Sequence, residues 1–236
     1  MTPRTALVVV PTYNELANLP VLVEGLMAQP NVRLLVVDDQ SPDGTGDLAD
    51  RLADGHAGRI RVLHRSGHRG LGRSYVDGLR AAVGEPVDVV CQMDADLSHD
   101  PVQLPALIAA AEQHDLAIGS RYVPGGRIVN WPLRRRLLSR FANAYVRTVT
   151  RLVVHDCTSG YRCWRRDVLA SLPLDRLTSD GYAFLVEMLY VAVRRGCHVA
   201  EVPITFVERR LGESKLSREV VVESAIAPWR IIADEP

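Results

Sequence analysis

Two acidic side chains, Asp94 and Asp96, are the residues of this 236-residue chain whose type and spacing point most directly to chemistry. They directly follow the apolar run Val87 to Met93, which predicts a buried strand. Two carboxylates at a strand end can ligate one hard cation, and Mg²⁺ or Mn²⁺ typically bridges such carboxylates to substrate phosphates. The pair therefore indicates a metal site for a diphosphate, and its alternative interpretation is a pair of solvated turn acids.

More acids are expected at the same edge of the predicted sheet. Glu15 follows the first predicted strand, Ala6 to Val10, and the pair Asp38 and Asp39 ends the second, Leu34 to Val37. Ligands bind outside the carboxyl ends of strands in open α/β sheets, so these acids indicate a crevice for a base, a ribose and a metal-bound diphosphate. The proline- and glycine-bearing residues that come next also suit a plain helix cap, which stays as the alternative.

Four basic residues are candidates for binding an anionic acceptor: Arg121, Arg135, Arg209 and Lys215. Arginine binds phosphate through two parallel hydrogen bonds and lysine acts as a point charge, so this mixture suits a phosphate monoester. Arginines on a helix otherwise most often form a solvated face, and that interpretation stays open for them.

The stretch Leu133 to Val154 predicts a helix with an apolar stripe opposite several arginines. A helix of this kind can lie on an anionic lipid surface, and a core or dimer-packing helix has almost the same pattern. The membrane interpretation is favoured because the basic residues of this helix lie near the candidate acceptor-binding groups.

Two further signals are weaker. Gly70-Leu71-Gly72 does not follow the first predicted strand and lacks a third correctly spaced glycine, so it is not a dinucleotide fingerprint and indicates only a helix start. His99 lies near the acidic pair, but a lone histidine is more often structural or exposed than a metal ligand.

The elements that must position these residues are short apolar runs alternating with amphipathic helical stretches. This alternation predicts an α/β fold with a mostly parallel sheet and helices on both faces. The predicted strands are Ala6 to Val10, Leu34 to Val37, Ile60 to Leu63, Val87 to Met93, Leu116 to Ile118 and Val199 to Phe206. The predicted helices include Leu16 to Met27, Asp47 to Leu52, Leu133 to Val154, Phe184 to Arg194 and Ser217 to Ile232, the last kinked or broken at Pro228.

At this length one domain is expected, with a nucleotide-binding half over 1–123 and an acceptor-binding half over 124–236. Lys+Arg 28 balance Asp+Glu 28 at a formal net charge of +0, so no global field favours a nucleic-acid partner. The four cysteines show no short paired spacing, so neither a zinc site nor a disulfide framework is expected, and a reducing cytoplasm is favoured. No signal peptide and no membrane-spanning run of about 18 apolar residues is expected.

Over nearly its whole length the chain resembles the polyprenol-phosphate mannosyltransferases, the dolichol-phosphate mannose synthase group within glycosyltransferase family 2. The early motifs that carry the resemblance are Pro11-Thr12-Tyr13-Asn14-Glu15, Val36-Val37-Asp38-Asp39 and Met93-Asp94-Ala95-Asp96-Leu97-Ser98-His99. The later and more specific ones are Gly119-Ser120-Arg121-Tyr122, Asn130-Trp131-Pro132, Thr158-Ser159-Gly160-Tyr161-Arg162 and the segment from Val202-Pro203 to Gly212-Glu213-Ser214-Lys215.

This resemblance implies a glycosyltransferase-A fold, a GDP-mannose donor, Mg²⁺ or Mn²⁺, and a polyprenyl phosphate acceptor. It also implies a peripheral position on the cytoplasmic face of a membrane, and it leaves a homo-oligomer open. Some members carry transmembrane helices after the catalytic domain, and none is expected within this sequence.

The resemblance also implies a set of site residues. Those implied around the nucleotide are Pro11, Tyr13, Glu15, Val37 and Asp39. Those implied around the diphosphate are Asp94, Ala95, Asp96 and Ser98, with Asp94, Asp96 and Ser98 as metal ligands. The residues implied at the phosphates are Arg121, Arg135, Arg209 and Lys215. The segment Glu208 to Ser214 is implied to be a mobile loop that covers the site. Some members have Gln where this chain has Ser98, so ligation there is expected to be weaker or water-mediated.

The expected reaction is a single inverting displacement in which the acceptor phosphate attacks the anomeric carbon. The rivals are the same chemistry with another sugar nucleotide such as UDP-glucose, and a non-catalytic sugar-nucleotide-binding or membrane-docking module. A phosphatase with Asp94 as its nucleophile is disfavoured, because its motif is expected on the first strand and here comes late.

Overall fold

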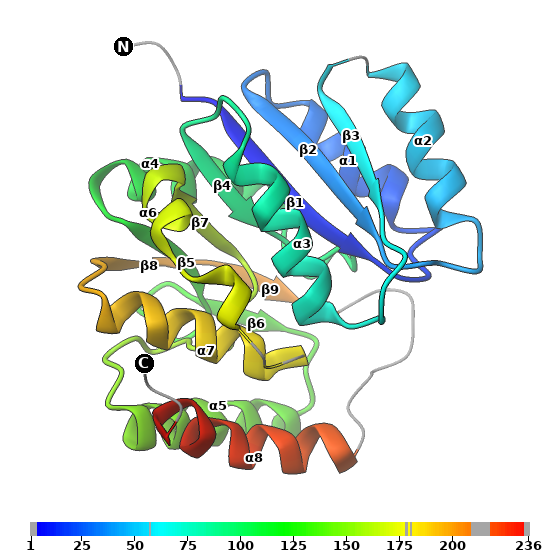
Figure 1. Cartoon of the computed structure of the whole chain (residues 1–236). Coiled ribbons are helices and arrows are strands. Elements are labelled where there is room, and N and C mark those ends of the chain that lie inside the picture. The colour runs from blue at the N-terminus through cyan, green and yellow to red at the C-terminus, as the bar shows by residue number, and fades with distance from the viewer. Residues whose placement is uncertain (1–3, 57, 178, 180, 209–217, 234–236) are drawn as a thin grey trace.

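A computed structural model describes residues 4–56, 58–177, 179, 181–208 and 218–233, and places a central sheet between two layers of helices (Figure 1). Among these residues, seven strands form the sheet in the order β3-β2-β1-β4-β7-β5-β8. They are β1 (Ala6–Thr12), β2 (Val32–Asp38), β3 (Ile60–His64), β4 (Val89–Gln92), β5 (Leu116–Ser120), β7 (Arg162–Arg165) and β8 (Val199–Pro203). Strand β7 is antiparallel to both of its neighbours, and the other pairings are parallel. The predicted mostly parallel α/β fold is confirmed.

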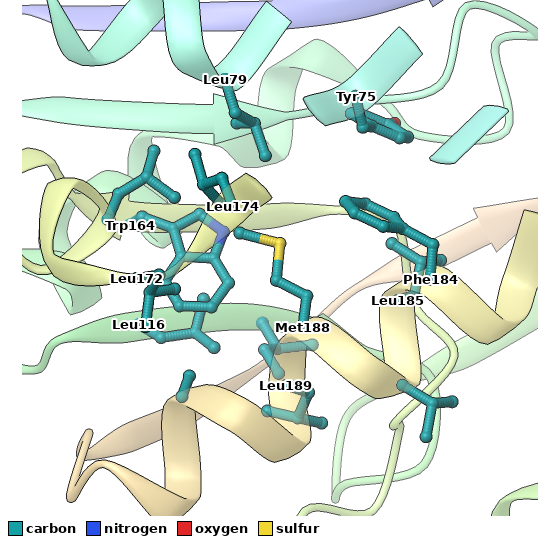
Figure 2. Packing of buried hydrophobic residues seen from close by; sticks show 14 of the residues in the cluster. Tyr75, Leu79, Leu116, Trp164, Leu172, Leu174, Phe184, Leu185, Met188 and Leu189 are labelled. Carbon is teal, nitrogen blue, oxygen red and sulfur yellow. The ribbon is translucent and has the colours of Figure 1, made fainter. Parts of the chain in front are cut away.

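Both faces of the sheet are buried because its strands are apolar on both sides. In β1, Leu7 and Val9 join one core cluster, whereas Val8 and Val10 join the other. The helices against the second cluster are α1 (Leu19–Met27), α2 (Thr45–Gly55) and α4 (Leu104–Gln113). Those against the first are α3 (Leu71–Val83), α6 (Arg166–Ser171) and α7 (Gly181–Arg194), and Figure 2 shows part of this packing.

Two further helices, α5 (Leu133–Thr150) and α8 (Arg218–Ala233), lie side by side beyond α7 (Figure 1). Trp229 of α8 donates a hydrogen bond from Nε1 to the hydroxyl of Tyr145 on α5 at 2.8 Å. Strands β6 (Arg127–Val129) and β9 (Thr205–Val207) form a separate parallel pair, and η1 (Pro101–Gln103) and η2 (Leu174–Arg176) are short 3₁₀ helices. Across the part of the chain that is described, no helix is long and apolar enough to cross a membrane.

Several predicted boundaries are wrong. The single strand predicted over Val199 to Phe206 is two strands in different sheets, because the chain leaves β5 after Pro203 and pairs with β6 instead. The helix predicted to reach Val154 ends at Thr150, where Arg151 takes a φ of 59° and turns the chain. The first helix begins at Leu19 rather than Leu16, and α8 runs through Pro228 rather than breaking there.

A disulfide joins Cys91 of β4 to Cys163 of β7, where the sequence predicts no pairing of cysteines. The two residues are 72 positions apart, but the antiparallel register of these strands sets them directly opposite each other, with Cα atoms 4.1 Å apart. The expectation of unpaired cysteines is therefore wrong at this position. Spacing along the chain carried no signal, because only the sheet register brings the two side chains together.

Candidate active site

The three predicted metal ligands lie on the wall of a cavity of about 270 Å³, in the loop directly after β4. Asp94, Asp96 and Ser98 all line it. Leu97 takes a φ of 61°, which turns the loop so that the backbone N–H of Ser98 donates to Oδ1 of Asp96 at 3.1 Å. The Ser98 hydroxyl is buried and has no hydrogen-bond partner among the described residues. These groups thus form a small oxygen-rich patch on the cavity wall.

His99 is buried beside this patch and holds the loop. Its Nδ1 accepts a hydrogen bond from the backbone N–H of Asp94 at 3.2 Å, and its ring stacks on Tyr161 at 4.9 Å. Burial lowers the pKa of His99. Because Nδ1 acts as an acceptor, it carries no proton, so its 4.0 Å separation from Oδ2 of Asp94 is not an ion pair. His99 therefore supports the backbone of the acidic pair.

Arg121, a predicted phosphate ligand, lines the same cavity as the acids. Its Nε and Nη2 donate to the two carboxylate oxygens of buried Asp156, each at 2.7 Å, and Nη2 also donates to Thr158 at 2.9 Å. The guanidinium carbon lies 5.1 Å from the centre of the Phe206 ring. One edge of the Arg121 guanidinium is thus fixed by the Asp156 carboxylate, which was not a predicted site residue.

Arg135, at the start of α5, also lines the cavity. Its Nη1 donates to Oε1 of Glu208 at 2.6 Å, and its guanidinium lies 4.2 Å from the centre of the Trp131 ring. Glu208 is the last described residue before the gap at 209–217, so Arg209, Lys215 and the remainder of the predicted loop lie outside the described residues.

Three helices supply mostly apolar parts of the cavity wall. These parts come from Leu138, Phe141, Tyr145 and Val146 of α5, Ala183 and Val186 of α7, and Ala227 and Pro228 of α8. The cavity wall therefore combines carboxylates and guanidinium groups with hydrocarbon from α5, α7 and α8. Such a wall is complementary to an amphiphilic ligand with an anionic head.

The residues predicted around a nucleotide lie at the carboxyl ends of β1 and β2, beside β4. Pro11 and Val37 are register partners in the β1–β2 ladder. Tyr13 accepts a hydrogen bond on its hydroxyl from Arg69 at 2.6 Å, and Glu15 accepts one from the side chain of Asn18 at 2.7 Å. These residues do not line the cavity described above, and they form a separate stretch of the same sheet edge.

Asp39, the last of the predicted nucleotide residues, is largely buried. It forms an ion pair with Arg65, and its Oδ2 accepts the backbone N–H of Gly70 at 2.8 Å. Arg65 also donates to Asp77 at 2.7 Å, so it joins the β2 end to α3. Burial alone lowers the pKa of Arg65, but hydrogen bonds and charge from Asp77 and Asp39 outweigh burial and raise it. Asp39 therefore has structural partners, and its nucleotide-binding role stays a prediction.

The acidic patch suits a divalent cation only if a substrate supplies further ligands. Within the described residues, no group of three or more His, Cys, Asp or Glu side chains is arranged to hold a metal ion. Mg²⁺ commonly binds through one or two carboxylates together with substrate phosphates. Asp94 and Asp96, with the unpartnered hydroxyl of Ser98, are the groups that could ligate such an ion beside a diphosphate.

Comparison with known proteins places the chain in a family. The family model described as glycosyl transferase family 2 matches residues 7–172, which include β4 and the acidic pair that follows it. The chain belongs to glycosyl transferase family 2. It is thus a glycosyltransferase, and the fold of this transferase is the glycosyltransferase-A arrangement expected from its motifs.

Two curated relatives resemble this glycosyltransferase over almost their full lengths. The polyprenol monophosphomannose synthase of Mycolicibacterium smegmatis is 47% identical over 98% of this chain and 88% of its own. The undecaprenyl-phosphate mannosyltransferase of Micrococcus luteus is 47% identical over 93% of this chain and 90% of its own. A crystal structure of glucosyl-3-phosphoglycerate synthase from Mycobacterium tuberculosis is similar in fold, with a TM-score of 0.67 at 21% identity over 95% of this chain and 80% of that one.

Sequence reasoning missed three residues that build the site: Tyr75, Asp156 and Gly160. Tyr75 donates a hydrogen bond to Asp94, and a Cβ on Gly160 would lie 3.2 Å from both oxygens of that carboxylate. Tyr75 follows the helix start predicted at Gly70-Leu71-Gly72, and no pattern in the sequence indicates its burial or its partner. Asp156 lies in a polar segment that gave no sign of pairing with Arg121, 35 residues earlier.

Proposed function

We propose that this glycosyltransferase transfers mannose from GDP-mannose to a polyprenyl phosphate, giving polyprenyl phosphate mannose with inversion at the anomeric carbon. The observation that carries the proposal is the cavity, whose wall combines acids and arginines with apolar side chains of three helices. A polyprenyl phosphate likewise combines an anionic head with an apolar chain. The names of both 47% identical relatives, which specify polyprenol-linked mannose, support the same acceptor and sugar.

In this proposal a divalent cation, Mg²⁺ or Mn²⁺, is held by Asp94, Asp96 and Ser98 together with the donor diphosphate. When bound, the cation offsets the charge that accumulates on the departing GDP. The protein would contribute two carboxylates and a hydroxyl from one loop on the cavity wall. The fixed loop geometry around Leu97 and His99 supports that role.

The acceptor phosphate needs little chemical activation. A phosphate monoester has a second pKa of about 6 and is anionic near neutral pH, so its oxygen can attack without a strong general base. That oxygen forms a bond to the anomeric carbon as the bond from this carbon to the diphosphate breaks. Arg121 and Arg135 would position the phosphate, so catalysis rests on alignment and on charge stabilisation.

The proposal includes a peripheral position on an anionic membrane surface, from which the acceptor enters the cavity. Leu133, Leu137 and Phe141 of α5 are 56–69% exposed, and Trp229 of α8 is 61% exposed. Arg134, Arg136 and Arg140 are exposed on the same helix α5. Exposed apolar side chains among arginines match the lipid-facing side of an interfacial helix.

The test is incubation of the protein with Mn²⁺ or Mg²⁺, a short polyprenyl phosphate and a panel of sugar nucleotides, followed by mass analysis of the lipid. We expect the acceptor to gain one hexose from GDP-mannose far faster than from UDP-glucose. Preference for UDP-glucose would replace the donor in this proposal. Absence of any glycolipid with every donor would favour a non-catalytic binding module.

A further inference from the structure

The hydroxyl of Tyr75 reaches the acidic pair from inside the core. Tyr75 lies on α3, its ring is fully buried, and it stacks on Phe184 of α7 with ring centres 6.0 Å apart and planes 6° apart (Figure 2). The hydroxyl donates to Oδ1 of Asp94 at 2.8 Å.

The Asp94 carboxylate has few other restraints. Among the described residues, no second side chain donates a hydrogen bond to it, and the bond to His99 involves the backbone N–H instead. Gly160 lies against both oxygens, at a position where a Cβ would come within 3.2 Å of each. The glycine therefore leaves room for the carboxylate, and the tyrosine is the group that can set its rotation.

We propose that Tyr75 is a positioning residue that fixes the orientation of the Asp94 carboxylate for cation binding. This inference rests on the proposed function. Rotation of a carboxylate about its last torsion is broad and nearly two-fold, so packing alone does not select one orientation. A hydrogen bond to one oxygen selects it and leaves the carboxylate oriented on the cavity wall. Such outer partners of metal ligands typically change metal affinity by about 10- to 100-fold when they are removed.

The experiment measures Mn²⁺ affinity in the presence of saturating GDP, by electron paramagnetic resonance of the free ion, for the wild type and Tyr75→Phe. Phenylalanine keeps the ring and its stack on Phe184 and removes only the hydroxyl. We expect Mn²⁺ to bind about 10- to 100-fold more weakly, with GDP affinity in EDTA unchanged. A fall in Mn²⁺ affinity with unchanged GDP affinity distinguishes a misoriented Asp94 carboxylate from a general loss of structure.

Tyr190→Phe is the matched control, because Tyr190 is buried in the same core cluster, on α7, and does not line the cavity. We expect its Mn²⁺ affinity to equal that of the wild type, and both variants to unfold cooperatively in urea. Equal Mn²⁺ affinity for Tyr75→Phe and wild type would overturn the positioning role. Equal affinity for Asp94→Asn and wild type would instead overturn the metal site of the proposed function.

Discussion

At the residue scale, Asp94 and Asp96 lie on one cavity wall but are held in different ways. The Asp94 carboxylate accepts a side-chain hydroxyl from the core, whereas Oδ1 of Asp96 accepts a backbone N–H from its own turn. Both face a space that also holds two arginines. In the proposed reaction each acid is therefore a separate support for the same cation, and loss of either should be severe.

We predict that Asp94→Asn and Asp96→Asn each lower the transfer rate by at least about 100-fold, because several kcal/mol of charge stabilisation is lost. Asp100→Asn is the matched control. Asp100 lies in the same loop and caps η1 through the N–H of Val102, a bond that asparagine also accepts, but it does not line the cavity. Glycolipid formation measured by mass should fall in the first two variants only, and full activity in either would refute its role.

Individual residues were predictable from the sequence where they follow an apolar run. Asp94 and Asp96 stand out because two charges end a buried strand, and the cavity that they line lies where the sheet edge predicts it. Tyr75 and Asp156 were not predictable as site residues. Their partners lie 19 and 35 residues away along the chain, and only the packing of α3 and of the segment before β7 brings them together.

At the element scale, Asp43 joins the start of α2 to the loop after β1. Its Oδ1 accepts the N–H of Thr45 at 3.0 Å and the Thr45 hydroxyl at 2.6 Å, and its Oδ2 accepts the N–H of Leu16 at 3.3 Å. Burial alone would raise the pKa of Asp43, but these hydrogen bonds outweigh it and lower the pKa below its ordinary value of 3.8. The ionised carboxylate is thus the form that stabilises the fold.

Since the folded-state pKa of Asp43 is depressed, its contribution to stability is present above the unfolded pKa and is lost as pH falls through the folded value. We predict that Asp43→Ala lowers the free energy of unfolding by about 1 kcal/mol at pH 7 and by less below about pH 4. Urea unfolding over this pH range measures the effect. Asp54→Asn, an exposed acid on the same helix, serves as the control, and a pH-independent loss in Asp43→Ala would contradict the assignment.

Most strands of the sheet were predicted well, whereas α4 and all but the start of α3 were not predicted. The apolar strands of the first half appear near their predicted positions because both faces of a parallel sheet are buried. Strand β7 (Arg-Cys-Trp-Arg) was not predicted, because an arginine at each end leaves only Cys163 and Trp164 as an apolar signal. The strand lies between β4 and β5 and pairs with both. The break at Ile204 was likewise set by a partner strand, β6, that no local pattern reveals.

At the scale of the whole molecule, strands from both parts of the chain share one sheet, and the helices of the later part supply most of the apolar wall of the cavity. Exposed apolar residues lie on α5 and α8, and two of them, Leu138 and Phe141, line the cavity. The sequence predicted an apolar stripe on α5 but left a core, a dimer and a membrane interpretation open. The exposure of the first half of α5 excludes its burial within the described part of this chain.

We predict that the double variant Leu133→Gln and Leu137→Gln binds anionic vesicles at least about tenfold more weakly, because each leucine loses about 1.5–3 kcal/mol of apolar transfer. Co-sedimentation with phosphatidylglycerol vesicles measures this. Val102→Gln, an exposed valine on η1 that is 80% accessible, is the control and should bind normally. Unchanged vesicle binding, together with loss of a dimer in sedimentation equilibrium, would instead assign this face to a second copy of the chain.

One measurement tests the central claim, that acids at the end of β4 hold a cation-bearing nucleotide. Crystals soaked with Mn²⁺ and GDP-mannose can be measured at the manganese absorption edge, where anomalous scattering locates the ion. We predict one strong peak within bonding distance of the carboxylates of Asp94 and Asp96, adjoining the diphosphate. A nucleotide bound with its manganese remote from both carboxylates would contradict the proposed site and the mechanism built on it.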